Sequence, residues 1–188
     1  MAAAISRHFA ILARLAFAAL LLAVPQAPAA APAAEHQIKA VYLFNFAQFV
    51  EWPQHAFASP DAPFVIGILG RDPVGRTLED VVRGESVNGH RFEVRHFAEA
   101  GKAGACHVLF IGRDMVAGLE QTLATLRGSN VLTVTDIDGA EQRGAVIALF
   151  NDSNRIRMRI NVAAAKANDL VISSKLLRPA EVVGAEAK

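Results

Sequence analysis

The sequence predicts an α/β protein: a single-domain sandwich in which helices flank a central mixed β-sheet, in a Rossmann-like arrangement. Strand-like segments alternate with helix-like segments along most of the 188 residues. The strand-like segments are rich in β-branched and aromatic residues and are bounded by Gly, Asp or Asn. They are Phe64–Gly70, Phe92–Phe97, His107–Gly112, Val131–Asp136, Ala145–Phe150 and Ile156–Asn161, with a short further candidate near Val171.

The apolar pattern of each strand indicates its place in the sheet. Phe64–Gly70 and His107–Gly112 are apolar on both faces, which is typical of central parallel strands that helices cover on both sides. Ile156–Asn161 alternates strictly between apolar and polar residues, which predicts one solvent-facing side. The linkers IDGAEQRG and NDSNR each join two consecutive strands, and they predict two antiparallel hairpins in the second half of the sheet.

Two strands end in the same tripeptide, Gly-Arg-Asp, at residues 70–72 and 112–114. Each tripeptide predicts a strand-to-helix turn. Asp72 suits an N-cap that Pro73 follows at the first helical position, and Asp114 could cap its own helix in the same way. A phosphate-binding loop is the alternative, but the segment lacks the Gly-Lys-Ser/Thr sequence of such loops.

The first 34 residues differ in composition from the rest of the chain. Arg7 and Arg14 precede the uninterrupted apolar run Leu15–Val24, and an Ala/Pro tract with small-x-small sites follows. This is the pattern of a secretory signal peptide, with cleavage expected within Ala29–Ala34. An uncleaved membrane anchor is the alternative, but a helix of this length spans about 15 Å of a hydrocarbon core about 30 Å thick. We therefore predict a periplasmic mature protein that begins close to Glu35.

Composition and charge favour one compact domain that does not bind nucleic acid. Removing residues 1–34 removes two of the 19 basic residues and none of the 18 acidic ones, so the mature chain has a formal charge of −1. A nucleic-acid-binding domain would carry a basic surface. No Ser/Gly/Pro-rich linker divides the rest. We therefore expect a signal peptide at 1–34, one α/β domain at 35–180 and a C-terminal tail at 181–188.

No motif predicts a catalytic, metal or cofactor site. The six histidines show no zinc-ligand spacing. Asp136, Asp138 and Gly139 begin a calcium-loop pattern that lacks its closing Glu, so a hairpin turn explains them better. No Gly-x-Ser-x-Gly sequence occurs, and residues 173–175 lack the Ser-x-x-Lys spacing. A catalytic triad of dispersed residues stays open, since such triads are recognised by geometry.

Cys106 is the only cysteine, so no intramolecular disulfide can form. It lies directly before an apolar run, which favours a small buried hydrophobic residue. The alternative is a redox site, as a sensor thiol or an intermolecular bridge. That role needs an exposed thiol with a lowered pKa.

A basic stripe is the first candidate for partner binding. Arg155, Arg157 and Arg159 line one face of the last long strand, because side chains alternate along a strand. The stripe is either a solvated face that protects a sheet edge or a surface for an acidic partner or an anionic cell-wall polymer.

The apolar stretch IKAVYLFNFAQFVEWP, residues 38–53, is the second candidate, and it predicts a helix that ends at Pro53. Helical periodicity places one set of large residues on the side that packs on the sheet: Tyr42, Leu43, Phe46, Phe49 and Val50. Val41, Phe44 and Trp52 share the opposite side with polar residues. These three are either covered by the chain's own loops or form a protein–protein contact, as a homodimer seam or a receptor surface.

Six blocks of sequence, in order over residues 36–178, resemble the YfiR/HmsC family of periplasmic proteins. They are IKAVYLFNFAQFVEWP, VIGILGRDPVG, NGHRFEV, CHVLFIG, VLTVTD and IRMRINVAAAKANDLVISSKLL. The resemblance implies a non-enzymatic homodimer that binds the periplasmic sensor domain of an inner-membrane diguanylate cyclase and represses cyclic-di-GMP signalling and biofilm formation. It also implies that an outer-membrane peptidoglycan-associated lipoprotein sequesters the repressor. Disulfides act in characterised members, whereas here only Cys106 matches a family cysteine.

A binding protein that holds a membrane receptor inactive is therefore the leading hypothesis, with no cofactor and no metal. A periplasmic small-ligand-binding sensor component is the main alternative, and an envelope hydrolase with a dispersed triad is a further one. A deep polar pocket at the strand ends would favour the sensor. An exposed apolar patch would favour the binding protein.

Overall fold

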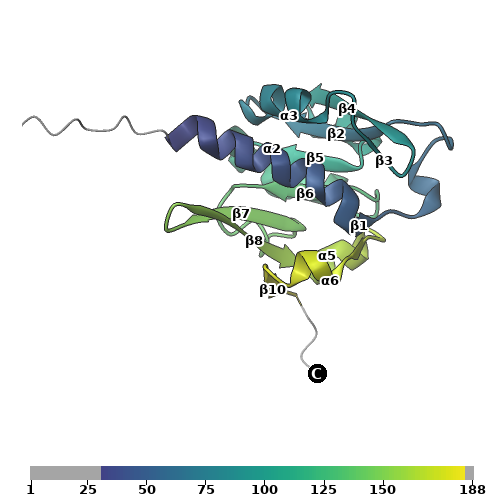
Figure 1. The fold of residues 1–188 in the computed structure, drawn as a ribbon. Helices are drawn as coiled ribbons and strands as arrows, with labels where there is room; N and C mark the ends of the chain where they lie inside the picture. Colours follow the sequence, from purple (N-terminus) through teal and green to yellow (C-terminus); the bar gives the residue numbers. More distant parts are fainter. Residues whose placement is uncertain (1–30, 185–188) are drawn as a thin grey trace, which may run out of the picture. The chain divides into compact units, whose positions relative to one another are not determined.

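The computed structural model describes residues 31–184, which form an eight-stranded mixed sheet with helices on both faces (Figure 1). The predicted α/β class with a central mixed sheet is confirmed. The strand order is β10-β8-β7-β6-β5-β2-β4-β3. The strands are β2 Phe64–Leu69, β3 Ser86–Val87, β4 His90–Phe97, β5 Val108–Ile111, β6 Leu132–Thr135, β7 Ile147–Asp152, β8 Arg155–Asn161 and β10 Glu181–Val183. A separate antiparallel pair joins β1 Val50–Glu51 to β9 Val171–Ile172.

Helices cover the central strands on both sides, as the apolar pattern predicts. The α-helices are α2 Ala31–Phe49, α3 Val74–Val82, α4 Leu119–Thr125, α5 Val162–Ala167 and α6 Ser174–Leu177, and the 3-10 helices are η1 Gln54–Ala56, η2 Ala100–Ala105 and η3 Arg113–Gly118. Ile66 and Ile68 of β2 belong to one buried cluster with α2 and α3, and Val65 and Leu69 to a second cluster with η2 and α4. Alternate side chains of one strand therefore serve two cores.

One predicted hairpin is confirmed and the other is wrong. β7 and β8 pair antiparallel through a tight turn at residues 153–154, whose φ angles of 52° and 64° are those of a type I′ turn. β6 and β7 instead run parallel, with Val134 opposite Ile147. The linker between them returns along the sheet because Ile137 and Ala140 are buried in the second core, whereas a hairpin turn would expose them.

The ends of the domain also differ from the prediction. The predicted C-terminal tail, 181–188, begins with β10, which pairs parallel with β8 at the edge of the sheet. The predicted signal peptide lies outside the described residues, except for residues 31–34, which belong to α2. The opening helix ends at Phe49 rather than at Pro53, because Val50 leaves it to pair with Ile172.

The two Gly-Arg-Asp turns lie side by side, because β2 and β5 are parallel neighbours. Asp72 Oδ1 accepts a hydrogen bond from the Val74 amide at the start of α3, at 2.9 Å. Asp114 does not cap its own helix. Its Oδ2 accepts the Arg71 amide of the neighbouring turn at 3.0 Å, and Gly70, with a φ of 96°, leaves room for its carboxylate. The repeated tripeptide thus fastens two strand ends together.

A buried ion pair fixes the amino-terminal half of α2 to the carboxyl end of β6. Lys39 Nζ lies 2.5 Å from Asp136 Oδ2, and each side chain is 3% exposed. Glu35 also pairs with Lys39, whose hydrogen bond lowers the pKa of this carboxyl group. Arg113 Nε reaches the same Asp136 oxygen at 3.0 Å. Asp136, which the sequence places at a hairpin turn, therefore anchors a helix.

Replacing Asp136 by Ala should lower the free energy of unfolding by about 3 kcal/mol, because it leaves the buried Lys39 charge without its buried partner and with only the partly exposed Glu35 beside it. Arg113→Ala is the control: this exposed arginine pairs with the same carboxylate, and its loss should cost less than about 1 kcal/mol. Urea unfolding followed by circular dichroism measures both. Equal costs for the two variants would contradict the anchoring role.

Candidate partner-binding groove

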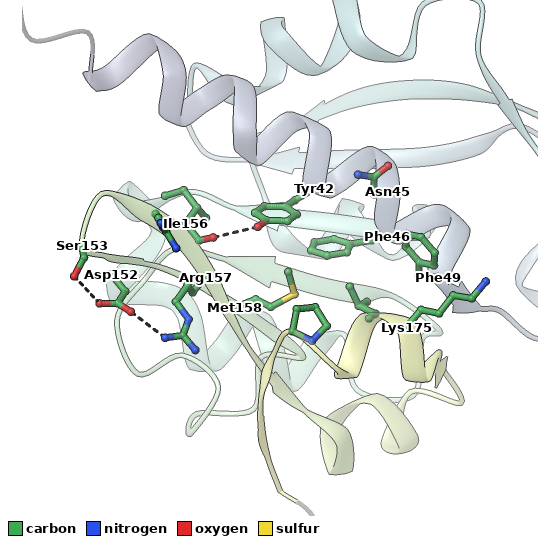
Figure 2. Close-up of a pocket in the computed structure, with 13 residues that line it drawn as sticks. Tyr42, Asn45, Phe46, Phe49, Asp152, Ser153, Ile156, Arg157, Met158 and Lys175 are labelled. Atoms are coloured by element: carbon green, nitrogen blue, oxygen red, sulfur yellow. Dashed lines mark hydrogen bonds and ion pairs between the residues drawn. The ribbon is translucent and has the colours of Figure 1, made fainter.

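A groove of about 610 Å³ lies between α2, the β7–β8 hairpin and α6 (Figure 2). Figure 2 shows side chains of α2 reaching toward Met158 across the groove. Its apolar part consists of Tyr42, Phe46 and Phe49 of α2, Ile156 and Met158 of β8, Leu176 of α6, and Pro179. Its polar part includes Asn45, Asp152, Ser153, Arg155, Arg157 and Lys175. The groove therefore combines large apolar side chains with a charged rim.

A stripe along α2 forms one wall of the groove and continues beyond it. Tyr42, Asn45 and Phe49 line the groove, and Ile38 extends the same stripe, since residues spaced by three or four lie on one helix face. Ile38 is 43% exposed. The Tyr42 hydroxyl donates to the Ile156 carbonyl at 3.1 Å, and its ring stacks on Phe46. These contacts hold the wall in place.

The hairpin supplies the charges of the rim. Arg157 Nη1 donates to Asp152 Oδ2 at 2.9 Å, which lowers the pKa of that carboxyl group. Arg157 also pairs with Glu181 at 3.6 Å. Within residues 31–184, Arg155 and Lys175 form no ion pair. These two exposed cations are available to an acidic partner.

The structure separates the three apolar residues predicted to share the outer side of the opening helix. Val41 is 42% exposed on α2. Phe44 is half-buried, with its ring centroid 5.2 Å from that of Phe92. Trp52 lies beyond the helix, where its ring packs on Phe64 and its Nε1 donates to the His107 carbonyl at 3.2 Å. The predicted common outer face is therefore wrong, because Phe44 and Trp52 pack on the core.

The three arginines of the predicted basic stripe also have different roles in the structure. Arg155 and Arg157 line the groove. Arg159 instead donates to Glu181 Oε2 at 2.9 Å, and its guanidinium lies 3.9 Å from the centroid of the Phe150 ring. Arg159 therefore fastens β10 to the sheet edge.

Cys106 has the properties of a buried hydrophobic residue. It is 5% exposed, and its thiol donates to the Ala103 carbonyl at 2.9 Å. Burial raises the pKa of the thiol to about 12. A redox-sensing cysteine needs the opposite, an accessible thiol with a lowered pKa. The structure thus favours the buried alternative over the redox role.

An aromatic cluster around His107 was missed by the sequence analysis, because its members come from separate segments. The His107 ring stacks on Phe57 and Phe64, with centroids 4.4 and 4.7 Å away. Its Nδ1 accepts the Val65 amide at 3.0 Å, which requires a neutral ring. Burial is the main cause that lowers the pKa of His107 to about 4. In the sequence, the only indication of this cluster is that His107 directly precedes an apolar strand.

Charged side chains pair with one another at the carboxyl ends of the central strands. β2 has β4 on one side and β5 on the other, and α/β folds commonly bind ligands at such a reversal of strand order. Here Asp114 holds the neighbouring turn and Asp136 holds Lys39. Within residues 31–184, no three His, Cys, Asp or Glu side chains gather as metal ligands.

Acid should destabilise the protein through His107. Its folded pKa of about 4 lies below the ordinary value, so the unfolded chain binds the proton first as the pH falls. The stability that the neutral His107 ring contributes is fully present above about pH 6.5, and it is lost as the pH falls toward about 4. Melting temperatures of His107→Phe should depend less on pH over this range than those of the native protein. The exposed-site control His55→Ala should keep the native slope, and an unchanged slope in His107→Phe would contradict the assignment.

Phe44→Ala should cost about 2 kcal/mol of stability, since a half-buried phenyl ring leaves the core. Val41→Ala, on the exposed side of the same helix, should cost less than about 0.5 kcal/mol. Chemical denaturation compares the two. A Phe44→Ala variant as stable as Val41→Ala would restore the outer-face interpretation for Phe44.

Comparisons with solved structures support the fold. The chain is similar to a structure described as a conserved domain protein from Vibrio cholerae O1 biovar El Tor str. N16961, with a TM-score of 0.52 and 11% sequence identity. The match covers 78% of this chain and 59% of the Vibrio chain, and at this identity it shows the fold alone. No curated protein matches the sequence. Among residues 31–184, no helix has the length and apolar character needed to span a membrane.

The family comparison covers nearly all of the described residues. The model of the YfiR/HmsC-like family matches residues 36–181. This family is periplasmic and regulatory rather than catalytic, and it acts in cyclic-di-GMP signalling. The match begins near the start of α2 and ends at the first residue of β10, so it spans both walls of the groove, and the chain belongs to the YfiR/HmsC-like family.

Proposed function

We propose that this protein is a non-enzymatic periplasmic repressor. It binds the periplasmic sensor domain of an inner-membrane diguanylate cyclase and so lowers cyclic-di-GMP synthesis and biofilm formation. Membership of a regulatory family supports the general role. The groove between α2 and the β7–β8 hairpin supports binding of another protein as the means.

The character of the groove and its surroundings is the observation that carries this proposal. Ile38 and Val41, both more than 40% exposed, extend an apolar helix surface next to the groove. Tyr42 and Phe49 lie in its wall, and Arg155 and Lys175 lie at its rim. Protein interfaces commonly place aromatic and aliphatic anchors inside a polar rim. We use the name docking surface for Ile38, Tyr42 and Phe49 together with the rim residues Arg155 and Lys175.

Repression follows if the docking surface binds the inactive state of the sensor domain more tightly than the active state. A ligand shifts a conformational equilibrium only by its difference in affinity for the two states. An outer-membrane peptidoglycan-associated lipoprotein that binds this protein in competition with the cyclase would release the cyclase from repression, again through a difference in affinity. Neither step requires a reaction in this chain.

Small-ligand sensing is a second candidate function, and the size of the groove favours it. A volume of about 610 Å³ falls within the range of about 300–1,000 Å³ of small-molecule sites. The aromatic wall and the nearby cations would suit an aromatic or anionic compound. Such a ligand would compete with the partner, since both would contact Tyr42 and Phe49.

Ile38→Glu should weaken binding to the purified sensor domain by roughly tenfold or more, since it places a charge at an apolar contact. Calorimetry measures the affinity, and cellular cyclic-di-GMP should rise in parallel. Val116→Glu is the matched control, because Val116 is 49% exposed on η3, outside the groove. Both variants should keep the native melting temperature. Native affinity in Ile38→Glu would contradict the docking surface.

Lys175→Glu separates the two candidate functions. Lys175 is exposed at the groove rim, so the change should not unfold the protein. A protein-binding role predicts weaker sensor-domain affinity without any added compound. A ligand-sensing role predicts native affinity without ligand, and a lost response to periplasmic small molecules in thermal-shift assays.

A further inference from the structure

Another cavity, of about 460 Å³, lies at the carboxyl end of α2, beside the first residues of β2 and β4. It shares no lining residue with the groove. Five segments build its wall: the end of α2, β1, the chain after η1, the start of β2 and the β3–β4 turn. Its volume is within the range of about 300–1,000 Å³ that small-molecule sites occupy.

Four rings form one part of this wall, namely those of Trp52, Phe57, Phe64 and His90. The Trp52 ring meets Phe64 edge-on, with centroids 4.9 Å apart and an angle of 86° between the planes. The Phe57 ring stacks on His90 at a centroid distance of 4.1 Å. Trp52 is half-buried, so part of its ring is open to the cavity. The face of an aromatic ring attracts cations, and Trp does so most strongly.

The polar side chains of the cavity also favour a cation. Among the residues that the structure describes, Glu51 is the one charged side chain in the lining, and no Lys or Arg joins it. Glu51 is exposed and, within residues 31–184, forms no ion pair. Nδ1 of His90 lies 2.6 Å from the Ala62 carbonyl and therefore carries the proton, so Nε2 of the neutral ring can only accept.

The end of α2 adds partial negative charge at the same place. Ala47 and Gln48, in the last turn of this 19-residue helix, line the cavity. The carboxyl end of a helix carries partial negative charge, which a basic residue in the last turn often offsets. The last turn of α2 contains no basic residue. The helix end and Glu51 thus act on the cavity with the same sign.

We propose that this cavity binds the ammonium group of a small organic cation, about the size of choline, against the Trp52 ring and beside the Glu51 carboxylate. A zwitterion such as an amino acid fits less well, because its own carboxylate finds no cationic side chain in the lining. A metal ion would need several oxygen ligands, whereas this wall is largely aromatic. The site does not depend on the proposed repressor role, because it lies outside the docking surface.

Three compounds of similar shape test the preference for a cation. Choline carries a quaternary nitrogen, 3,3-dimethylbutan-1-ol has a neutral carbon in its place, and glycine betaine adds a carboxylate. Choline should bind the purified protein roughly tenfold more tightly than either of the others, since it alone has a net positive charge. Isothermal titration calorimetry measures the three affinities. Equal affinity for choline and the neutral alcohol, or no measurable binding of choline, would overturn the proposal.

Two substitutions test the residues. Glu51→Gln removes the charge of an exposed side chain, so it should keep the native melting temperature and weaken choline binding about fivefold. Trp52→Leu should weaken it roughly tenfold, and Glu51→Gln decides the matter if Trp52→Leu does not fold. Asp138→Asn is the matched control, because it removes an exposed carboxylate outside the cavity, and it should keep the native affinity. Native affinity in Glu51→Gln, or an equal loss in Asp138→Asn, would contradict the site.

The same ammonium group occurs in free amines and in lipid headgroups, and vesicles distinguish the two sources. Cosedimentation of the protein with phosphatidylcholine vesicles, lost in Glu51→Gln, would assign a headgroup to the cavity. Choline binding without cosedimentation would assign a soluble cation. Cosedimentation that Glu51→Gln leaves unchanged, in a protein that does not bind free choline, would place the membrane contact elsewhere and overturn the proposal.

Discussion

The attachment of α2 to the rest of the domain at both of its ends is the constraint on which the rest of the structure depends. At the amino-terminal end, the buried pair of Lys39 and Asp136 holds the helix over the carboxyl end of β6. At the carboxyl-terminal end, the chain leaves the helix at Val50 and pairs with Ile172 of β9. Between these points Leu43 and Phe46 are fully buried. The helix therefore has one fixed rotation about its axis.

That fixed rotation decides which side chains can meet another protein. With Leu43 and Phe46 turned to the core, Ile38 and Val41 point away from it, and Tyr42 and Phe49 form the wall of the groove. A rotation of one residue would bury this stripe and expose the core side chains instead. The helix α6, which completes the groove, directly follows β9, and β9 is the strand that pairs with the end of α2. The strand that fixes the end of α2 and the helix that borders the docking surface are therefore consecutive elements of the chain.

Much of the fold could be predicted from the sequence, since the central strands show their burial in their composition. Phe64–Leu69 is apolar at every position, and all six residues are buried. The parallel course of β6 and β7 could not be predicted, because Asp138 and Gly139 have the composition of a turn. The burial of Ile137 and Ala140 on either side of them depends on a core that other segments build. Periodicity placed Val41 correctly but not Phe44, since the neighbour that covers it, Phe92, is 48 residues further along the chain. The groove was missed for the same reason: α2, β8 and α6 form it together.

The contacts that hold the first helix come from the last parts of the chain. Lys39 and Asp136 are separated by 97 positions, and the partner of Val50 is Ile172. Contacts of such large sequence separation form late, since they close long loops. While the chain is being made and exported, α2 has no complete site on which to dock, and its apolar side remains exposed. The first helix of the described residues is therefore among the last to reach its native place, and its apolar side stays exposed until then.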